Sequence, residues 1–267
     1  MINEEKTPPG SFSSSGTVLR LARRLRLRRE REKTGLCLVE GPRAVEEALT
    51  VATLEAVLHT PDFARERPAL LATVPAGVPV FQTSEKEFDA LARTETPQGI
   101  LAVVRIRSSS WEKMVAAGRS LVVLDGLQDP GNLGTIIRAA TAFGAGVVCG
   151  AGSVDPYNPK VVRATAGYLF RSPPALLPRL GVEGVELLRG AGYRIFAAAP
   201  KGGVELPEAD LTGPVAVWIG NEGMGLPAEV LAAADGTLRI PAPGPVESLN
   251  AGVAAAIILY EIARHRE

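Results

Sequence analysis

The stretch Leu121–Ala145 constrains the possible fold more than any other part of this sequence. It opens with four apolar residues, Leu-Val-Val-Leu, which are typical of a strand buried on both faces. A dense group of turn-forming residues follows, and the next apolar residues recur at helical spacing until Gly144. Open α/β sheets bind their ligands at such loops, between the carboxyl end of a buried strand and a helix. We therefore expect an α/β domain with a ligand site here.

Two polar residues of this loop and helix, Asn132 and Arg138, lie less than two helical turns apart. If the helix begins near Gly131, both side chains can approach one ligand above the end of the strand. Each residue also has a purely structural interpretation. Asn132 suits a helix N-cap, and Arg138 suits a solvated helix surface. Taken alone, the pair favours the structural interpretation.

Two later segments repeat the arrangement of strand, polar loop and helix. Val215–Ile219 suits a buried strand and leads into the sequence GNEGMG, Gly220–Gly225, whose glycines let the backbone approach a ligand closely. Thr237–Ile240 suits a short strand, followed by a loop rich in proline and glycine, the sequence ESLN and an apolar helix, Ala251–Ile262. The chain therefore carries three loops of ligand-binding type.

These three segments resemble the motifs of the SpoU/TrmH family of RNA ribose 2′-O-methyltransferases, which belong to the SPOUT class. The first is the NxxxxxR pattern of Asn132–Arg138, the second is GNEGMG, and the third is ESLN, Glu247–Asn250. Their order and spacing agree with the family pattern. The resemblance implies methyl transfer from S-adenosylmethionine, a mostly parallel α/β sheet with a trefoil knot, and a homodimer. The knot follows from the resemblance alone, because chain connections normally avoid threading.

The resemblance also implies roles for individual residues. The residues implied in catalysis are Arg138, Asn132, Glu222, Ser248 and Asn250. The residues implied in cofactor binding are Ile219, Gly220, Glu222, Ile240, Leu249 and Asn250. Ser248 suits either a hydrogen bond to the substrate or a cap for the last helix, and both interpretations stay open.

Arg138 is the residue that the family's mechanism proposes as activator of the ribose hydroxyl. A guanidinium has no acceptor and a pKa above about 12, so it is a poor base. We expect Arg138 to hold an RNA phosphate and stabilise the developing alkoxide while another group takes the proton. The alternative is a guanidinium whose pKa is strongly lowered by the sulfonium and by burial, so that it can lose its proton and act as the base. Glu222 is expected to position Arg138 and Asn132, and the sequence does not identify the general base.

The N-terminal region is rich in arginine. Residues 1–16 lack apolar periodicity and are expected to form a flexible tail. From Val18 to Lys33, eight basic residues, seven of them arginine, surround an apolar helical stripe. A solvated helix face is the usual meaning of such a run, but arginine favours bidentate phosphate contact. The residues predicted to bind RNA are Arg20, Arg23, Arg24, Arg43 and Arg138.

Strand and helix patterns alternate from Leu36 to Arg105 and predict a smaller α/β domain. The segments LCLVEGPRAVEEAL and TPQGILAVV resemble the substrate-binding domain, similar to certain ribosomal proteins, of many family members. The family's usual Asn and Lys before the first helix are Gly16 and Arg20 here. The predicted organisation is a flexible tail (1–16), an RNA substrate-binding domain (17–107), a linker (108–118) and a SPOUT methyltransferase domain (119–267).

Composition argues against several other classes of protein. The formal net charge is +0, which disfavours non-specific nucleic-acid binding over the whole surface. Without an apolar run of transmembrane length or a convincing targeting peptide, the protein is expected to be cytoplasmic, with no membrane partner. The two cysteines are expected to be buried and unpaired, and with two histidines they predict no metal site. Dinucleotide-binding and P-loop patterns do not occur, which disfavours oxidoreductases and ATPases.

Two classes of function stay open. In the first, the chain methylates a ribose 2′-hydroxyl of structured RNA. Large-subunit, 23S-type rRNA is favoured over tRNA because the N-terminal domain accompanies rRNA enzymes in the family. In the second, a protein of the same fold binds RNA without a cofactor. The intact site residues favour the enzyme. The nucleotide, and whether methylation serves ribosome maturation or antibiotic resistance, depend on RNA shape.

Overall fold

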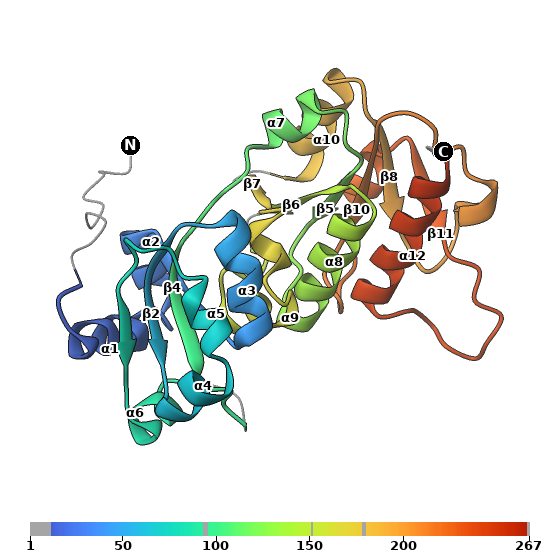
Figure 1. The fold of residues 1–267 in the computed structure, drawn as a ribbon. Helices are drawn as coiled ribbons and strands as arrows, with labels where there is room; N and C mark the ends of the chain where they lie inside the picture. The colour runs from blue at the N-terminus through green and yellow to red at the C-terminus, as the bar shows by residue number, and fades with distance from the viewer. Residues whose placement is uncertain (1–11, 93–95, 151, 178–179, 266–267) are drawn as a thin grey trace. The chain divides into compact units, whose positions relative to one another are not determined.

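The computed structural model describes residues 12–92, 96–150, 152–177 and 180–265, and Figure 1 shows their fold. Contacts divide the chain into two compact units. The first contains residues 1–107 and 157–171, and the second contains residues 108–156 and 172–267. The predicted domains place 157–171 with the methyltransferase domain, whereas these residues group with the first unit. Within the described ranges, no helix combines the length and apolar character needed to span a membrane.

The first unit is built on a four-stranded mixed sheet with the strand order β1-β4-β2-β3. β4 pairs antiparallel with β1 and β2, and β3 pairs parallel with β2. Helices and strands alternate as the sequence predicts. The elements are α1 (Ser15–Arg24), α2 (Arg28–Thr34), β1 (Leu36–Glu40), α3 (Pro42–Val51), β2 (Leu54–His59), α4 (Pro61–Glu66), α5 (Pro68–Ala72), β3 (Val80–Gln82), α6 (Glu85–Asp89), β4 (Ile100–Arg105), α9 (Pro159–Ala164) and the 3-10 helix η1 (Tyr168–Phe170).

The folded part of the N-terminal region begins earlier than expected. Ser14 caps α1 by accepting a hydrogen bond from the backbone N–H of Thr17, and Phe12 is buried in the core of the unit. Residues 12–16 of the predicted tail are therefore folded, whereas residues 1–11 lie outside the described ranges.

This region also forms two helices, α1 and α2, rather than one. The break between them is stabilised by Arg31, whose buried guanidinium donates to the carbonyl oxygens of Leu25 (2.8 Å) and Arg26 (3.0 Å). Arg26 in turn donates to the carbonyl oxygens of Ala90 (2.8 Å) and Leu91 (2.5 Å). These two arginines therefore stabilise the fold of the unit.

The second unit is built on a seven-stranded sheet with the order β7-β6-β5-β10-β8-β11-β9. Every neighbouring pair is parallel, which confirms the predicted parallel α/β fold. The trefoil knot stays a prediction. The elements are α7 (Trp111–Ala116), β5 (Leu121–Leu124), α8 (Pro130–Ala142), β6 (Gly146–Gly150), β7 (Ala175–Leu177), α10 (Gly181–Gly190), β8 (Arg194–Ala198), β9 (Val204–Glu205), the 3-10 helix η2 (Leu206–Glu208), β10 (Val215–Ile219), α11 (Ala228–Ala233), β11 (Gly236–Arg239) and α12 (Ala251–Arg264).

Helices cover both faces of this sheet. α12 packs along α8 beside β6 and β10 (Figure 1). On the other face, buried residues of β5, β8 and β10 pack against α7, α10 and α11, with Trp218 of β10 fully buried among them. Because both faces are covered, a ligand reaches this sheet at an edge formed by strand ends and loops.

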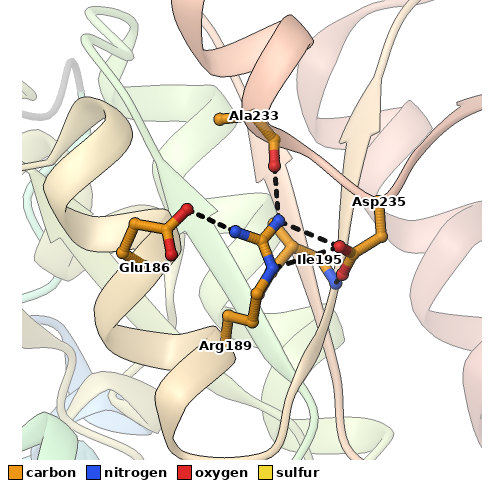
Figure 2. Close-up of polar contacts among 5 residues, drawn as sticks. All are labelled: Glu186, Arg189, Ile195, Ala233 and Asp235. Carbon is orange, nitrogen blue, oxygen red and sulfur yellow. Dashed lines mark hydrogen bonds and ion pairs between the residues drawn. The ribbon is translucent and has the colours of Figure 1, made fainter.

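A polar cluster ties α10 to β8 and to the start of β11 (Figure 2). Arg189 donates to Asp235 Oδ1 from Nε (3.2 Å) and Nη2 (2.9 Å), to the carbonyl oxygen of Ala233 (2.5 Å) and to Glu186. Asp235 Oδ2 accepts a hydrogen bond from the backbone N–H of Ile195 (2.7 Å). Burial acts to raise the pKa of Asp235, but these donors outweigh it and hold the pKa below its ordinary value. The cluster thereby stabilises one side of the sheet.

Both cysteines are buried, as predicted, and they do not form a disulfide. Burial, with a smaller contribution from Asp155, raises the pKa of the Cys149 thiol to about 12. Such a thiol stays protonated and unreactive at neutral pH. In the part of the chain that the structure describes, no group of histidine, cysteine and acidic residues is arranged to hold a metal ion.

Candidate active site

A cavity of about 690 Å³ opens at the carboxyl edge of the second unit's sheet. Residues that end or follow three neighbouring strands, β10, β8 and β11, contribute to its lining, together with the start of α12. Its volume lies within the usual range for small-molecule sites. The lining consists of residues 198–200, 219–226, 238–240 and 246–251, with Asn132, Leu231, Ala242, Ala254 and Ile258.

Every residue predicted for catalysis or cofactor binding lines this cavity except Arg138. Arg138 is exposed on α8 and is not among the lining residues. The structure therefore brings the second and third segments together at one site, with Asn132 from the first segment. The predicted catalytic roles stay predictions.

The loop after β10 is held in shape by its own hydrogen bonds. Asn221 Oδ1 accepts from the backbone N–H groups of Gly223 (2.9 Å) and Met224 (3.1 Å), and the backbones of Asn221 and Gly225 exchange two hydrogen bonds. A Cβ atom on Gly220 would lie 2.3 Å from the backbone carbonyl carbon and oxygen of Gly225, so only glycine fits there. This folded loop presents the Met224 side chain, which is 87% exposed, at the cavity.

Glu222 joins this loop to the loop after β5. Its Oε1 accepts from the backbone N–H of Asp129 (3.0 Å) and from Asn132 Nδ2 (3.1 Å), and its Oε2 accepts from the backbone N–H of Gln128 (3.1 Å). Partial burial acts to raise the pKa of Glu222, but the backbone donors and Asn132 outweigh it and hold the pKa below its ordinary value. Glu222 is therefore a charged link between two loops at neutral pH.

The N-cap interpretation of Asn132 is wrong. Asp129 is the N-cap of α8, and its side chain accepts from the backbone N–H of Asn132 (2.7 Å). The Asn132 side chain is buried and bonded to Glu222, so the expected contact between these two residues is present. Positioning of Arg138 by Glu222 stays a prediction.

The third segment begins the last helix. Asn250 is the N-cap of α12, and its Oδ1 accepts from the backbone N–H groups of Gly252 (3.0 Å) and Val253 (3.2 Å). Ser248 lies two residues before this cap, so the interpretation of Ser248 as the cap is wrong. Ser248 lines the cavity, and its side chain makes no hydrogen bond to another described residue.

Several lining residues were missed by the sequence analysis. Ala198 ends β8, and Ala199 and Pro200 follow it without the glycines or polar residues of the other loops. For Asn221 the signal lies in the GNEGMG segment, because an asparagine side chain in a turn commonly hydrogen-bonds the backbone of that turn. Glu247 belongs to the ESLN segment, whose resemblance implies no role for it. Leu231 lies on α11, which was not predicted.

The lining fits S-adenosylmethionine in its chemistry. Backbone from two strand-end loops offers amide and carbonyl groups, which suit the polar edges of an adenosine. Leu231, Leu238 and Ile258 offer apolar surface, and the carboxylates of Glu222 and Glu247 favour a ligand with positive charge.

The residues predicted to bind RNA are all exposed. In the first unit, Arg20 and Arg23 lie on α1 and Arg43 lies at the start of α3. Arg24 is also exposed, although it pairs with Glu30. RNA binding by these residues stays a prediction.

Comparisons with known proteins agree with this architecture. Residues 119–260 match the SpoU rRNA Methylase family, and residues 18–102 match the MRM3-like substrate binding domain. The 23S rRNA (guanosine(2553)-2′-O)-methyltransferase RlmP of Bacillus subtilis is 35% identical over 241 residues, which are 90% of this chain and 93% of the relative. The 23S rRNA (uridine(2479)-2′-O)-methyltransferase of Streptomyces viridochromogenes is 34% identical over 251 residues, 90% of this chain and 86% of the relative.

Solved structures match over both units. The SpoU methyltransferase AviRb from Streptomyces viridochromogenes, in complex with the cofactor AdoMet (S-adenosylmethionine), has a TM-score of 0.81 at 30% identity. The match covers 93% of this chain and 98% of that chain. An AdoMet-bound rRNA methyltransferase from Sinorhizobium meliloti has a TM-score of 0.79 at 30% identity, and the match covers 94% and 97%.

Together, the parallel sheet and the cavity at its strand ends define an α/β enzyme that binds its ligand through loops. The chain belongs to the SpoU rRNA Methylase family. The family predicted from the three segments is thereby confirmed, and with it the methyltransferase class and its methyl donor, S-adenosylmethionine.

Proposed function

We propose that this protein transfers the methyl group of S-adenosylmethionine to a ribose 2′-hydroxyl of large-subunit rRNA. The observation that carries the proposal is the meeting of the second and third segments with Asn132 at one cavity. The two relatives, both 23S rRNA 2′-O-methyltransferases by name, support the ribose and the RNA. One is named for a guanosine and the other for a uridine, so they support no single nucleotide.

Two asparagines supply complementary polar groups to the site. Asn132 gives its amide N–H to Glu222 and keeps Oδ1 for a ligand. Asn250 gives Oδ1 to the backbone of α12 and keeps its N–H groups. When bound, S-adenosylmethionine supplies an electrophilic methyl group on a positively charged sulfur. An acceptor and a donor fixed in one cavity can orient the ribose hydroxyl toward that methyl group, which lowers the entropic part of the barrier.

Ser248, which lines the cavity, and Arg138, which lies outside its lining, are the other residues of the proposal. Asn250 rather than Ser248 caps α12, so the Ser248 hydroxyl is not needed by the helix. In the proposal this hydroxyl hydrogen-bonds the substrate. Arg138 is an exposed guanidinium that binds an RNA phosphate and stabilises the developing negative charge. Substrate RNA is also held in the first unit through Arg20, Arg23, Arg24 and Arg43, which are exposed and suited to phosphate.

A homodimer and a cytoplasmic location belong to the proposal. The dimer is supported by α12, which exposes Val253, Ile257 and Tyr260 while Ala254 and Ile258 line the cavity. A second copy on the exposed side would therefore lie beside the site. Sedimentation velocity tests this arrangement, and a monomer at all concentrations would contradict it.

The cytoplasmic location is supported by the ribosomal substrate.

The proposal is tested by methyl transfer from radiolabelled S-adenosylmethionine to large-subunit rRNA, small-subunit rRNA and tRNA, each separated by size. We expect label in the large rRNA, and loss of that label with Arg138→Ala. Label in tRNA alone would favour a tRNA methyltransferase instead. Folded native protein that labels no RNA would favour the interpretation as a cofactor-free binding protein.

A further inference from the structure

The charged side chains at the cavity differ in whether they are already neutralised. The described lining contains Glu222, Arg239 and Glu247 as its charged residues. Glu222 accepts three hydrogen bonds, and Arg239 is paired with Glu205 of the neighbouring strand β9. Glu247 is exposed and has no hydrogen bond or ion pair with any other described residue. It is therefore the carboxylate of the lining whose oxygens are free for a ligand.

The reaction needs a group that accepts a proton from the ribose hydroxyl, and few candidates line the cavity. Its described lining contains no histidine, lysine, cysteine or tyrosine. Both oxygens of Glu222 are occupied by N–H donors, which hold its pKa low and make it a weak base. Asp125, whose pKa is raised by burial and by Glu229, is not among the lining residues. Arginine and amide side chains have no suitable basic atom.

We propose that Glu247 is the catalytic residue that accepts the proton of the ribose 2′-hydroxyl, an inference that rests on the proposed function. The hydroxyl O–H bond breaks and its proton goes to the Glu247 carboxylate. A lone pair of the ribose oxygen forms the bond to the methyl carbon, and the electrons of the breaking carbon–sulfur bond stay on sulfur. The exposed position of Glu247 then lets the proton pass to solvent. Glu222, held by backbone, remains a positioning residue.

Glu247→Gln tests this role because it keeps the side chain's size and removes the base. Glu247→Asp keeps a carboxylate, and Glu208→Gln makes the same change at an exposed glutamate outside the lining. We expect Glu247→Gln to lower kcat about 100-fold or more. We expect Glu208→Gln to match the native protein and Glu247→Asp to retain more activity than Glu247→Gln. Calorimetry should show that the Kd for S-adenosylmethionine rises far less than kcat falls in Glu247→Gln, and that the Kd for RNA stays close to native in every variant.

The pH dependence provides a second test. With native protein, kcat should rise on the acid side as a carboxylic acid ionises, and Glu247→Gln should lose that rise. A Glu247→Gln protein that keeps kcat within about threefold of native would overturn the assignment. So would a loss confined to the Kd of S-adenosylmethionine, which would make Glu247 a partner of the cofactor's ammonium group. If native protein methylates no RNA, the proposed function fails together with this role, and native activity therefore separates the two failures.

Discussion

Glu222 illustrates how much of the site depends on one side chain. It satisfies two backbone N–H groups of the loop after β5 and also fixes the amide of Asn132. A loop with unpaired amides would be free to adopt other conformations, and Asn132 would lose its partner. The carboxylate therefore shapes the cavity without needing to touch the reacting atoms.

Glu222→Gln should lower kcat/KM by roughly tenfold or more, because displaced polar groups orient a substrate poorly.

Since the pKa of Glu222 is lowered in the folded protein, its contribution to stability is present above the unfolded pKa and is lost as pH falls through the folded pKa. Urea unfolding of the native protein and of Glu222→Gln, from pH 7 down to about pH 3, measures this effect. The difference between their free energies of unfolding should shrink as the pH falls. A difference independent of pH would contradict an ionised link.

Gly220→Ala should destabilise the second unit by about 1–3 kcal/mol, because the new Cβ would overlap the backbone of Gly225. Gly190→Ala is the matched control. Gly190 is the last residue of α10, and nothing lies within 4 Å of its ideal Cβ position. Thermal unfolding should leave the control close to native or slightly more stable. Equal effects of the two changes would show that the loop after β10 accommodates a side chain.

The sequence predicted which residues belong to the site better than it predicted which atoms those residues contact. Eight of the nine predicted catalytic and cofactor-binding residues line the cavity, because their segments follow or precede recognisable elements. Sequence spacing could not decide which polar group caps which helix. Asp129 and Asn132 are both suitable N-cap residues for α8, and Ser248 and Asn250 are both suitable N-cap residues for α12. The outcome depends on where each helix starts, which tertiary packing decides.

At the scale of elements, long apolar runs were easier to predict than short or amphipathic ones. β5 and β10 have the predicted bounds because a run of buried aliphatic residues has few other structures available. β9 has two residues and β7 has three, too few for a periodic pattern. The break between α1 and α2 depends on Arg31, whose contacts lie within a charge run that looked continuous.

Asp235→Asn tests the cluster that joins α10 to β8 and β11 (Figure 2). The change weakens the hydrogen bonds from Arg189 and the backbone of Ile195, and it should destabilise the protein by about 1 kcal/mol at pH 7, partly screened by solvent. Because the folded pKa of Asp235 is lowered, the native advantage should persist above the unfolded pKa and disappear below the folded one.

Chemical denaturation at several pH values measures the effect of Asp235→Asn. Glu186→Gln is the control, since Glu186 contacts the same arginine from the exposed side and should matter much less. A larger effect of the control would show that the cluster is held together from its surface.

At the scale of the whole molecule, RNA attraction has to come from local rather than overall charge. The formal net charge is +0, so an RNA would feel little average field. The first unit concentrates arginine on two helices, and the structure separates these arginines by role. Arg26 and Arg31 bond backbone carbonyls, whereas Arg20 and Arg23 are exposed.

The double variant Arg20→Ala, Arg23→Ala should therefore weaken RNA binding without unfolding the unit. Each phosphate that is no longer neutralised should reduce the slope of log affinity against log salt by about 0.7–0.9, so removing both arginines should reduce it by about 1.5. Filter binding of large-subunit rRNA between about 50 and 200 mM salt measures this slope. Affinity for S-adenosylmethionine should stay at the native value, because the cavity lies in the other unit.

Arg65→Ala is the control for charge, because Arg65 is exposed on α4 but already paired with Asp62. It removes one positive charge from the same unit and should leave the salt slope close to native. Arg65 lies on α4, outside the arginine-rich helices α1 and α2, so its loss should remove no phosphate contact. A native slope in the double variant would mean that α1 presents its arginines to solvent alone, and that the RNA is held by other residues of the chain.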